Sequence, residues 1–129
     1  MVHMNRHESR ENAMIVLYQH YLLQVDVDEL IDQQFQLDSE DIDPYILNVI
    51  HTATSNTNNY SKQIDKILID WSYERLGFIE KALLNMGCAE FEINEVERPV
   101  IINEAVELAK EYCDAETSTA CPVGGRGEV

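Results

Sequence analysis

The apolar positions of this chain recur every three or four residues up to about residue 113, which is the spacing of one face of an α-helix. Ser9 is a suitable N-cap for a first helix that runs to about Gln24. Its apolar positions form two stripes, one of Ala13, Val16, Leu17 and His20 and one of Met14, Tyr18, Tyr21 and Val25. Such a helix is either the central helix of a bundle or keeps one stripe for a partner.

The middle of the sequence predicts a short helix followed by a long one. The short helix covers about residues 27–37. After Asp43 and Pro44, one apolar phase continues as far as Trp71 and favours a single long helix. The stretch TATSNTNNYS in its middle consists of weak helix formers that could bend or break it.

Two further helices complete the predicted set. One runs from about Arg75 to Phe91 and contains Gly87, which costs roughly 1 kcal/mol relative to alanine and is tolerable where another helix packs close. The other covers residues 99–113. No segment shows the alternation of a strand, so we predict an all-α fold with five or six helices. Residues 114–129 lack periodicity and are rich in glycine, which predicts a disordered tail.

Composition excludes several classes of protein. A chain of 129 residues with 45% apolar residues is one domain. Neither a run of about 20 apolar residues nor a secretory signal is present, so we expect a soluble, cytoplasmic protein without membrane contact. The cysteines lack CxxC spacing and the histidines lack an HExxH pattern. We therefore expect no metal, no cofactor and no enzymatic activity.

The net charge of −15 is unusual for a nucleic-acid-binding protein, which normally carries a basic surface that neutralises phosphates. Eight acidic residues lie between positions 26 and 43, where no lysine or arginine occurs. We interpret that run as a solvated acidic helix and loop. The charge also leaves open a second hypothesis, an acidic helical adaptor that does not bind RNA.

Three groups of residues occur in the order and at the spacing of a known family. The first group is Arg6, Arg10, Glu11, Ala13, Leu17 and Tyr18. The second is Trp71, Arg75, Leu76, Glu80, Lys81, Ala82, Leu83, Gly87, Glu90 and Phe91. The third is INEAVELAK at residues 102–110. Together they resemble the NusB family of bacterial transcription antitermination factors, which implies two small helical bundles packed together within residues 1–113.

The resemblance implies binding rather than catalysis. Proteins of this family pair with the ribosomal protein NusE, and the two hold the boxA element of nascent, notably ribosomal, RNA. The complex helps RNA polymerase to read through terminators. We therefore expect boxA RNA, NusE and the RNA polymerase antitermination complex as partners, and no DNA. A further alternative is the NusB-like domain of an rRNA methyltransferase, although the sequence contains neither a Gly-rich cofactor loop nor a catalytic cysteine motif.

Four RNA-binding residues follow from the same resemblance. Arg6 and Arg10 match the arginine-rich N-terminal arm, where a permanently charged, forked guanidinium suits phosphates and bases. Tyr73 and Arg75 match a turn near the RNA, where they could stack on it or pair with it. Neighbouring glutamates offset the charge of the arm. We therefore expect RNA binding to depend on the ribosomal partner.

Three residues match positions at the interface with the ribosomal protein. They are Tyr18, Glu80 and Glu116. Tyr18 is equally compatible with a place in the core of the bundle, and Glu80 with an internal pair or a solvated position. We assign Asn103 and Glu104, which are distinctive of the family, to structure rather than to binding.

The family pattern stops shortly after Cys113. Family members continue with a pattern of the type F-(V/I)-N-G-V-L that opens a last helix, and residues 118–129 contain nothing similar. The resemblance therefore implies that the last helix is missing or replaced by a tail foreign to the family. Because one apolar helix is a large part of the stability of a small domain, we expect a destabilised or self-associating protein.

Overall fold

The computed structural model describes residues 4–113, so the predicted tail and Glu116 lie outside the described residues. This part of the chain contains six α-helices, two short 3-10 helices and no strand, which confirms the all-α prediction for it. The α-helices are α1 (Arg6–Leu23), α2 (Val27–Phe35), α3 (Pro44–Ser55), α4 (Thr57–Ile67), α5 (Phe78–Ile93) and α6 (Arg98–Tyr112). The 3-10 helices are η1 (Ser39–Asp41) and η2 (Tyr73–Arg75).

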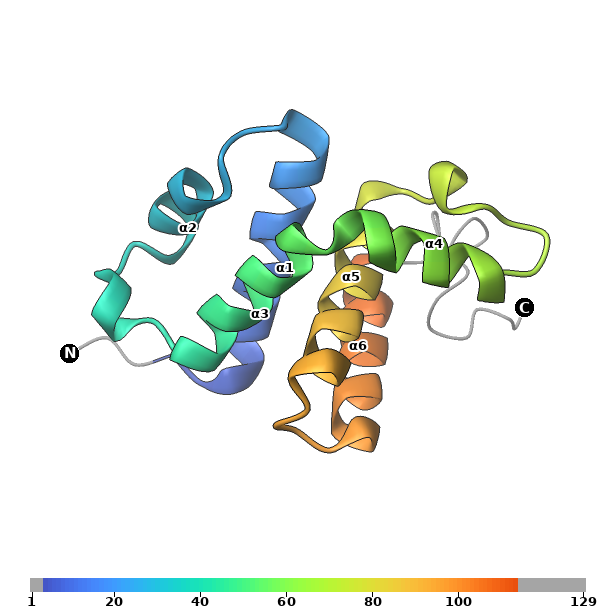
Figure 1. The fold of residues 1–129 in the computed structure, drawn as a ribbon. Helices are drawn as coiled ribbons and strands as arrows, with labels where there is room; N and C mark the ends of the chain where they lie inside the picture. Colours follow the sequence, from blue (N-terminus) through green and yellow to red (C-terminus); the bar gives the residue numbers. More distant parts are fainter. Residues whose placement is uncertain (1–3, 114–129) are drawn as a thin grey trace.

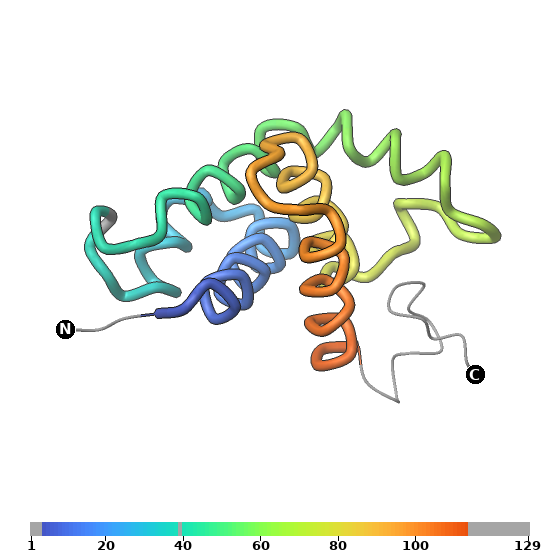
Figure 2. The backbone as a smooth tube through the Cα atoms, turned by 90° about the horizontal axis from the view of Figure 1, so that it is seen from below, coloured from blue at the N-terminus to red at the C-terminus, as the bar shows by residue number. Residues whose placement is uncertain are grey.

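The helices form two groups that pack side by side (Figure 1). Helices α1, α2 and α3 make one group, and α4, α5 and α6 make the other; Figure 2 shows the same division from below. Across the boundary, α5 packs against both α1 and α3. The arrangement is that of two small packed bundles, as the resemblance implied.

Helix α1 is the central helix of the first bundle, because it contacts α2, α3 and α5. Both of its predicted stripes contribute to the core. The fully buried side chains of α1 come from the two stripes together and are Ala13, Met14, Val16 and Leu17. The two tyrosines of the second stripe, Tyr18 and Tyr21, are half-buried and pack against this core. The central-helix interpretation of the two stripes is therefore confirmed.

Helix α1 begins earlier than the sequence pattern indicated. Asn5 is its N-cap: the Asn5 side chain accepts a hydrogen bond from the Glu8 backbone N–H, and the Glu8 carboxylate accepts one from the Asn5 N–H. The prediction that Ser9 caps the helix is wrong, because Ser9 is buried inside the first turns. A reciprocal capping box satisfies two N–H groups that a single serine cannot.

The predicted long helix after Pro44 is in fact two helices separated by Asn56, whose backbone (φ −119°, ψ 14°) is not helical. The side chains of Asn56 and Thr57 donate hydrogen bonds to the carbonyls of Thr52 and Ala53. Asparagine and threonine compete with the backbone in this way for hydrogen bonds. The break thus falls inside the stretch of weak helix formers, and the single-helix prediction is wrong.

Gly87 in α5 does not mark a close approach of another helix. Apart from its chain neighbours and the backbone of its own helix, a Cβ built on it meets no described atom within 4 Å. The condition that the sequence analysis named, a closely packed helix, is therefore not met at this glycine. Elsewhere α5 contributes the buried residues Ala82, Leu83, Met86 and Ala89 to the hydrophobic core. Among the described helices, none is both long and apolar enough to cross a membrane.

Candidate functional site

Arg10, the second arginine of the predicted RNA-binding arm, lies inside the protein. Its side chain is paired with Glu90 of α5: Nη2 lies 2.9 Å from Oε1 and Nε lies 3.1 Å from Oε2. Arg10 is 3% exposed and Glu90 is 2% exposed. The Arg10 guanidinium therefore donates hydrogen bonds to a buried carboxylate and links α1 to α5.

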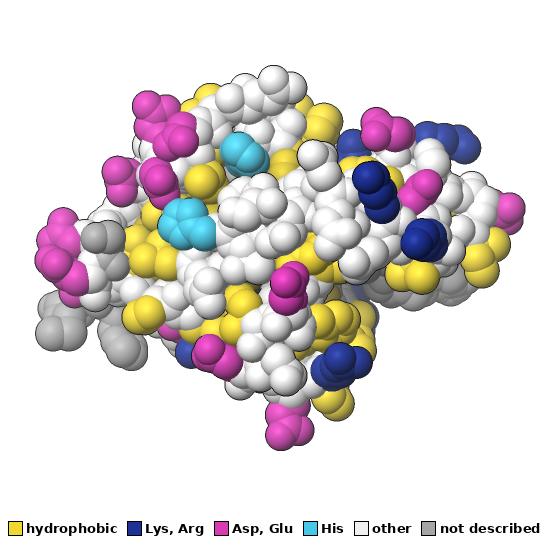
Figure 3. All heavy atoms as spheres, viewed as in Figure 1, with side chains coloured by type: hydrophobic (Ala, Val, Ile, Leu, Met, Phe, Trp, Pro, Cys, Tyr) yellow, Lys and Arg dark blue, Asp and Glu magenta, His cyan; other side chains and the backbone are white. Residues whose placement is uncertain are grey.

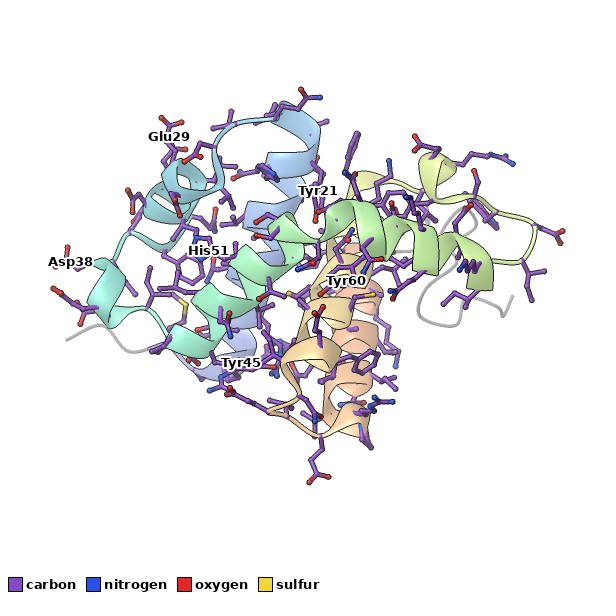
Figure 4. All side chains as sticks on the ribbon, in the orientation of Figure 1. Tyr21, Glu29, Asp38, Tyr45, His51 and Tyr60 are labelled. Atoms are coloured by element: carbon purple, nitrogen blue, oxygen red, sulfur yellow. The ribbon has the colours of Figure 1, made fainter. Side chains whose placement is uncertain are left out.

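Tyr45 extends this pair towards the surface. It lies at the start of α3, close to the first turn of α1 (Figure 4), and its hydroxyl donates to Glu90 Oε1 over 2.6 Å. Burial, followed by the hydrogen bond to Glu90, raises the pKa of Tyr45 well above its ordinary value. The hydroxyl consequently keeps its proton and acts as a donor to the buried carboxylate.

Arg6 is the arginine of the arm that stays accessible. Its side chain is 45% exposed, and its Nε donates to Asp43 Oδ2 over 2.6 Å. The guanidinium carbon lies 4.6 Å from the centroid of the Tyr45 ring, which is the geometry of a cation–π contact. The other Asp43 oxygen, Oδ1, accepts the Tyr45 N–H and caps α3. Arg6 and Arg10 are thus connected through Tyr45.

The predicted RNA-facing turn is η2. Tyr73 is 9% exposed; its hydroxyl accepts a hydrogen bond from Asn85 Nδ2, and its backbone N–H donates to Asp65. Arg75 is exposed, and its guanidinium lies 5.5 Å from the centroid of the half-buried Trp71 ring. In this arrangement Arg75 offers a cation at the surface, while Tyr73 holds the turn against α5.

The residues predicted to contact the ribosomal partner lie in different environments. Tyr18 is half-buried on α1. Glu80 is 7% exposed and lies in the first turn of α5, where the helix dipole stabilises a negative charge. The Cys113 thiol donates a hydrogen bond to its Oε2 over 3.4 Å. Among the described residues, the structure therefore gives Glu80 an internal contact with a thiol, rather than with a basic side chain or with solvent.

The surface charge is unevenly distributed (Figure 3). Acidic side chains gather over α2 and η1, where the exposed residues include Asp28, Glu29 and Asp32. Lysines and arginines gather instead over α4 and η2, which carry Lys62, Lys66 and Arg75. The acidic run is the solvated face that the sequence indicated, and it occupies a different part of the surface from these cations.

Tyrosine–carboxylate pairs between helices were missed by the sequence analysis. Besides Tyr45 and Glu90, the Tyr60 hydroxyl of α4 donates to Glu92 of α5, and the Tyr112 hydroxyl of α6 donates to Glu11 of α1. Figure 4 shows Tyr60 directed from α4 towards α5. The partners are far apart in the chain, so no local pattern could have paired them.

His7 connects the first turns of α1 to α6. Its Nδ1 lies 2.7 Å from Glu104 Oε1, which agrees with the structural role assigned to Glu104. The hydrogen bond to Glu104 raises the pKa of His7 above 6.5 in spite of desolvation, and the charges of Glu11 and Glu111 act in the same direction.

We expect the contact between His7 and Glu104 to stabilise the fold at acidic pH and to weaken at alkaline pH. Because the folded-state pKa of His7 exceeds the unfolded value, the contribution is complete below about pH 6.5 and is lost as the pH rises through the folded-state pKa. Urea unfolding at pH 5.5 and 8.5 should show that Glu104→Gln costs more at the lower pH, by less than about 1 kcal/mol for this exposed pair. An equal cost at both pH values would contradict the assignment.

Comparison with known proteins assigns the fold and the family. A model of the NusB family matches residues 7–119, which passes the predicted domain end at residue 113. The chain is 39% identical over 120 residues to the transcription antitermination protein NusB of Exiguobacterium sp., covering 88% of both chains. It is 30% identical over 112 residues to NusB of Bacillus subtilis, covering 86% of this chain and 84% of that one.

Solved structures agree with this result. A crystal structure of the antitermination factors NusB and NusE in complex with dsRNA contains a chain that matches with a TM-score of 0.73 and 27% identity, over 88% of this chain and 89% of that one. NusB of T. maritima has the same fold, with a TM-score of 0.77 at 21% identity over 90% of this chain and 84% of that one. The helical chain described here therefore belongs to the NusB family.

Proposed function

We propose that this protein is a transcription antitermination factor, not an enzyme, and that it binds the boxA element of nascent ribosomal RNA together with NusE. The observation that carries the proposal is the 39% identity to a NusB antitermination protein along 88% of both chains. The similarity to a chain of the complex of NusB, NusE and dsRNA supports it. The complex acts in the cytoplasm, where it joins the RNA polymerase antitermination complex on the emerging transcript.

Within this proposal, the four residues predicted to bind RNA have two kinds of role. Arg6 and Arg75 contact the RNA directly, because both are exposed and permanently charged. Arg10 and Tyr73 support these two residues from inside the protein. Arg10 pairs with Glu90, which accepts a hydrogen bond from the Tyr45 hydroxyl next to Arg6. Tyr73 holds η2 against α5. The accessible cations are few, which is why NusE has to contribute to RNA affinity.

Tyr18, Glu80 and Glu116 remain the proposed contacts for NusE. Tyr18 and the 42% exposed Leu22 are one turn apart on α1 and form part of one face, which suits an apolar partner surface. Glu80 supports such a surface by holding the start of α5 close to the end of α6. Glu116 lies outside the described residues.

The test is a titration of fluorescent boxA RNA with this protein, in the presence and absence of NusE. We expect weak binding by the protein alone and tight binding once NusE is added, with an affinity that falls as salt increases. Arg6→Gln should weaken the ternary complex. Arg98→Gln, which removes the same charge from the exposed start of α6, is the matched control and should have a smaller effect.

Two outcomes would reject the proposal. If no ternary complex forms at low salt, the protein does not act as a boxA-binding antitermination factor. If NusE binds but RNA affinity is the same with and without this protein, the acidic helical adaptor is the correct description instead.

A further inference from the structure

The guanidinium of Arg6 is held on two sides, and the two contacts differ in kind. The guanidinium carbon lies over the Tyr45 ring, 4.6 Å from its centroid. Asp43 lies at its edge and accepts the Nε–H over 2.6 Å. The N–H donors of a guanidinium point outward in its plane. The contact with the ring is a cation–π contact, whereas the carboxylate occupies one of those donors, the Nε–H.

Tyr45 is a fixed platform for Arg6. The residue is 8% exposed, and its hydroxyl is anchored on Glu90, which is itself held by the buried Arg10. A ring fixed at its far end restricts the positions that the stacked guanidinium can take. Less conformational entropy is then lost when the arginine binds a ligand.

Asp43 occupies a donor of Arg6 that could otherwise bind a phosphate. A carboxylate and a phosphate compete for the same donors of arginine, and both form charge-assisted hydrogen bonds with it. The two oxygens of Asp43 have different partners: Oδ2 accepts the Arg6 Nε–H, whereas Oδ1 accepts the Tyr45 N–H and caps α3. Releasing Arg6 thus breaks one exposed ion pair and leaves the helix cap intact.

From this geometry we infer that Tyr45 is a positioning residue for Arg6 and that Asp43 is an internal competitor that an RNA phosphate displaces from the Arg6 edge. The inference rests on the proposed function, since it specifies how the accessible arginine of the arm meets RNA. It identifies an autoinhibitory contact within the chain: the acidic side chain lowers RNA affinity, while the aromatic one raises it.

The first test is Asp43→Asn, because asparagine also caps helices but carries no charge. Binding of boxA RNA in the presence of NusE should tighten about two- to fivefold. This factor corresponds to the free energy of one exposed ion pair, which the wild type has to break on binding and the variant does not. Asp41→Asn is the matched control: it removes the same charge from an exposed η1 residue to which the structure gives no contact with Arg6.

Arg6→Gln provides the decisive background. If Asp43 acts by occupying Arg6, the gain from Asp43→Asn disappears when Arg6 is absent. A gain that persists in the Arg6→Gln protein, or one that Asp41→Asn reproduces in full, would show general charge repulsion and overturn the competitor role.

The platform is tested by Tyr45→Leu in a double-mutant cycle with Arg6→Gln. We expect Arg6→Gln to weaken RNA binding at least threefold more in the wild-type background than in the Tyr45→Leu background, because only the tyrosine positions the guanidinium. A purely structural role of Tyr45 would leave the effect of Arg6→Gln equal in both backgrounds. Urea unfolding of each variant defines the conditions under which all of them remain folded.

The wild-type titration separates the two levels of inference. If the wild-type protein and NusE bind no boxA RNA, the proposed function and the roles of Asp43 and Tyr45 are rejected together. If the wild type binds RNA but Asp43→Asn and Tyr45→Leu show no coupling to Arg6, the proposed function stands and the inference about these two residues is rejected alone.

Discussion

Replacing Glu90 with alanine is expected to destabilise the folded protein by about 3–5 kcal/mol, the cost of leaving one charge of a buried pair without its partner. The Arg10 guanidinium, which is buried in the wild type, would lose its carboxylate partner, and the Tyr45 hydroxyl would lose its acceptor. Urea unfolding followed by circular dichroism at pH 7 measures the change. It is comparable to the whole stability of many small domains, so much of the variant should be unfolded.

A matched variant separates the charge from the packing. The triple substitution Arg10→Met, Glu90→Leu and Tyr45→Phe removes the charges and the hydroxyl together and fills the site with apolar side chains of similar size. Its stability should lie close to that of the wild type or above it, because such a replacement avoids desolvating two ions. A loss below about 1 kcal/mol for Glu90→Ala would contradict the buried pair shown by the structure.

Leu17→Ala is expected to cost about 2–5 kcal/mol, the range for truncating a fully buried leucine. Leu17 has no exposed surface and lies in the middle of α1, the helix that contacts α2, α3 and α5. The cavity would therefore open inside the hydrophobic core. Thermal and urea unfolding of the variant give the change in free energy.

Leu22→Ala on the same helix is the control. Leu22 is 42% exposed, so its truncation should change the free energy of unfolding by no more than about 0.5 kcal/mol. If NusE protects wild-type Leu22 from solvent, the same variant should weaken NusE binding while leaving stability unchanged. Equal destabilisation by both substitutions would show that α1 is not the central helix in solution.

The sequence indicated the helices well wherever a long apolar stripe governs them. The two stripes of α1 include its fully buried apolar residues, because burying a stripe contributes more free energy than any local preference. Boundaries were less predictable. The start of α1 depends on the capping box of Asn5 and Glu8, and the break at Asn56 depends on side-chain hydrogen bonds that compete with those of the helix backbone. The spacing of apolar residues contains no information about either.

The candidate site was predicted in part. Arg6 and Arg10 have the same chemistry and lie four residues apart, so the sequence treats them alike. The structure places Arg6 at the surface and Arg10 beside Glu90, a partner 80 positions away. Which arginine is accessible depends on the packing of α5 against α1, and no local pattern contains that information.

By itself, then, the sequence determined the class of fold, the family and the residue types available for binding RNA, because helical periodicity and family motifs are written in local order. Only the tertiary structure decided which of those residues are accessible, and that Tyr45 and Asp43 surround Arg6. The physical reason is that burial, ion pairing and stacking arise between residues that helix packing brings together. The separation of two such residues along the chain does not predict whether they are in contact.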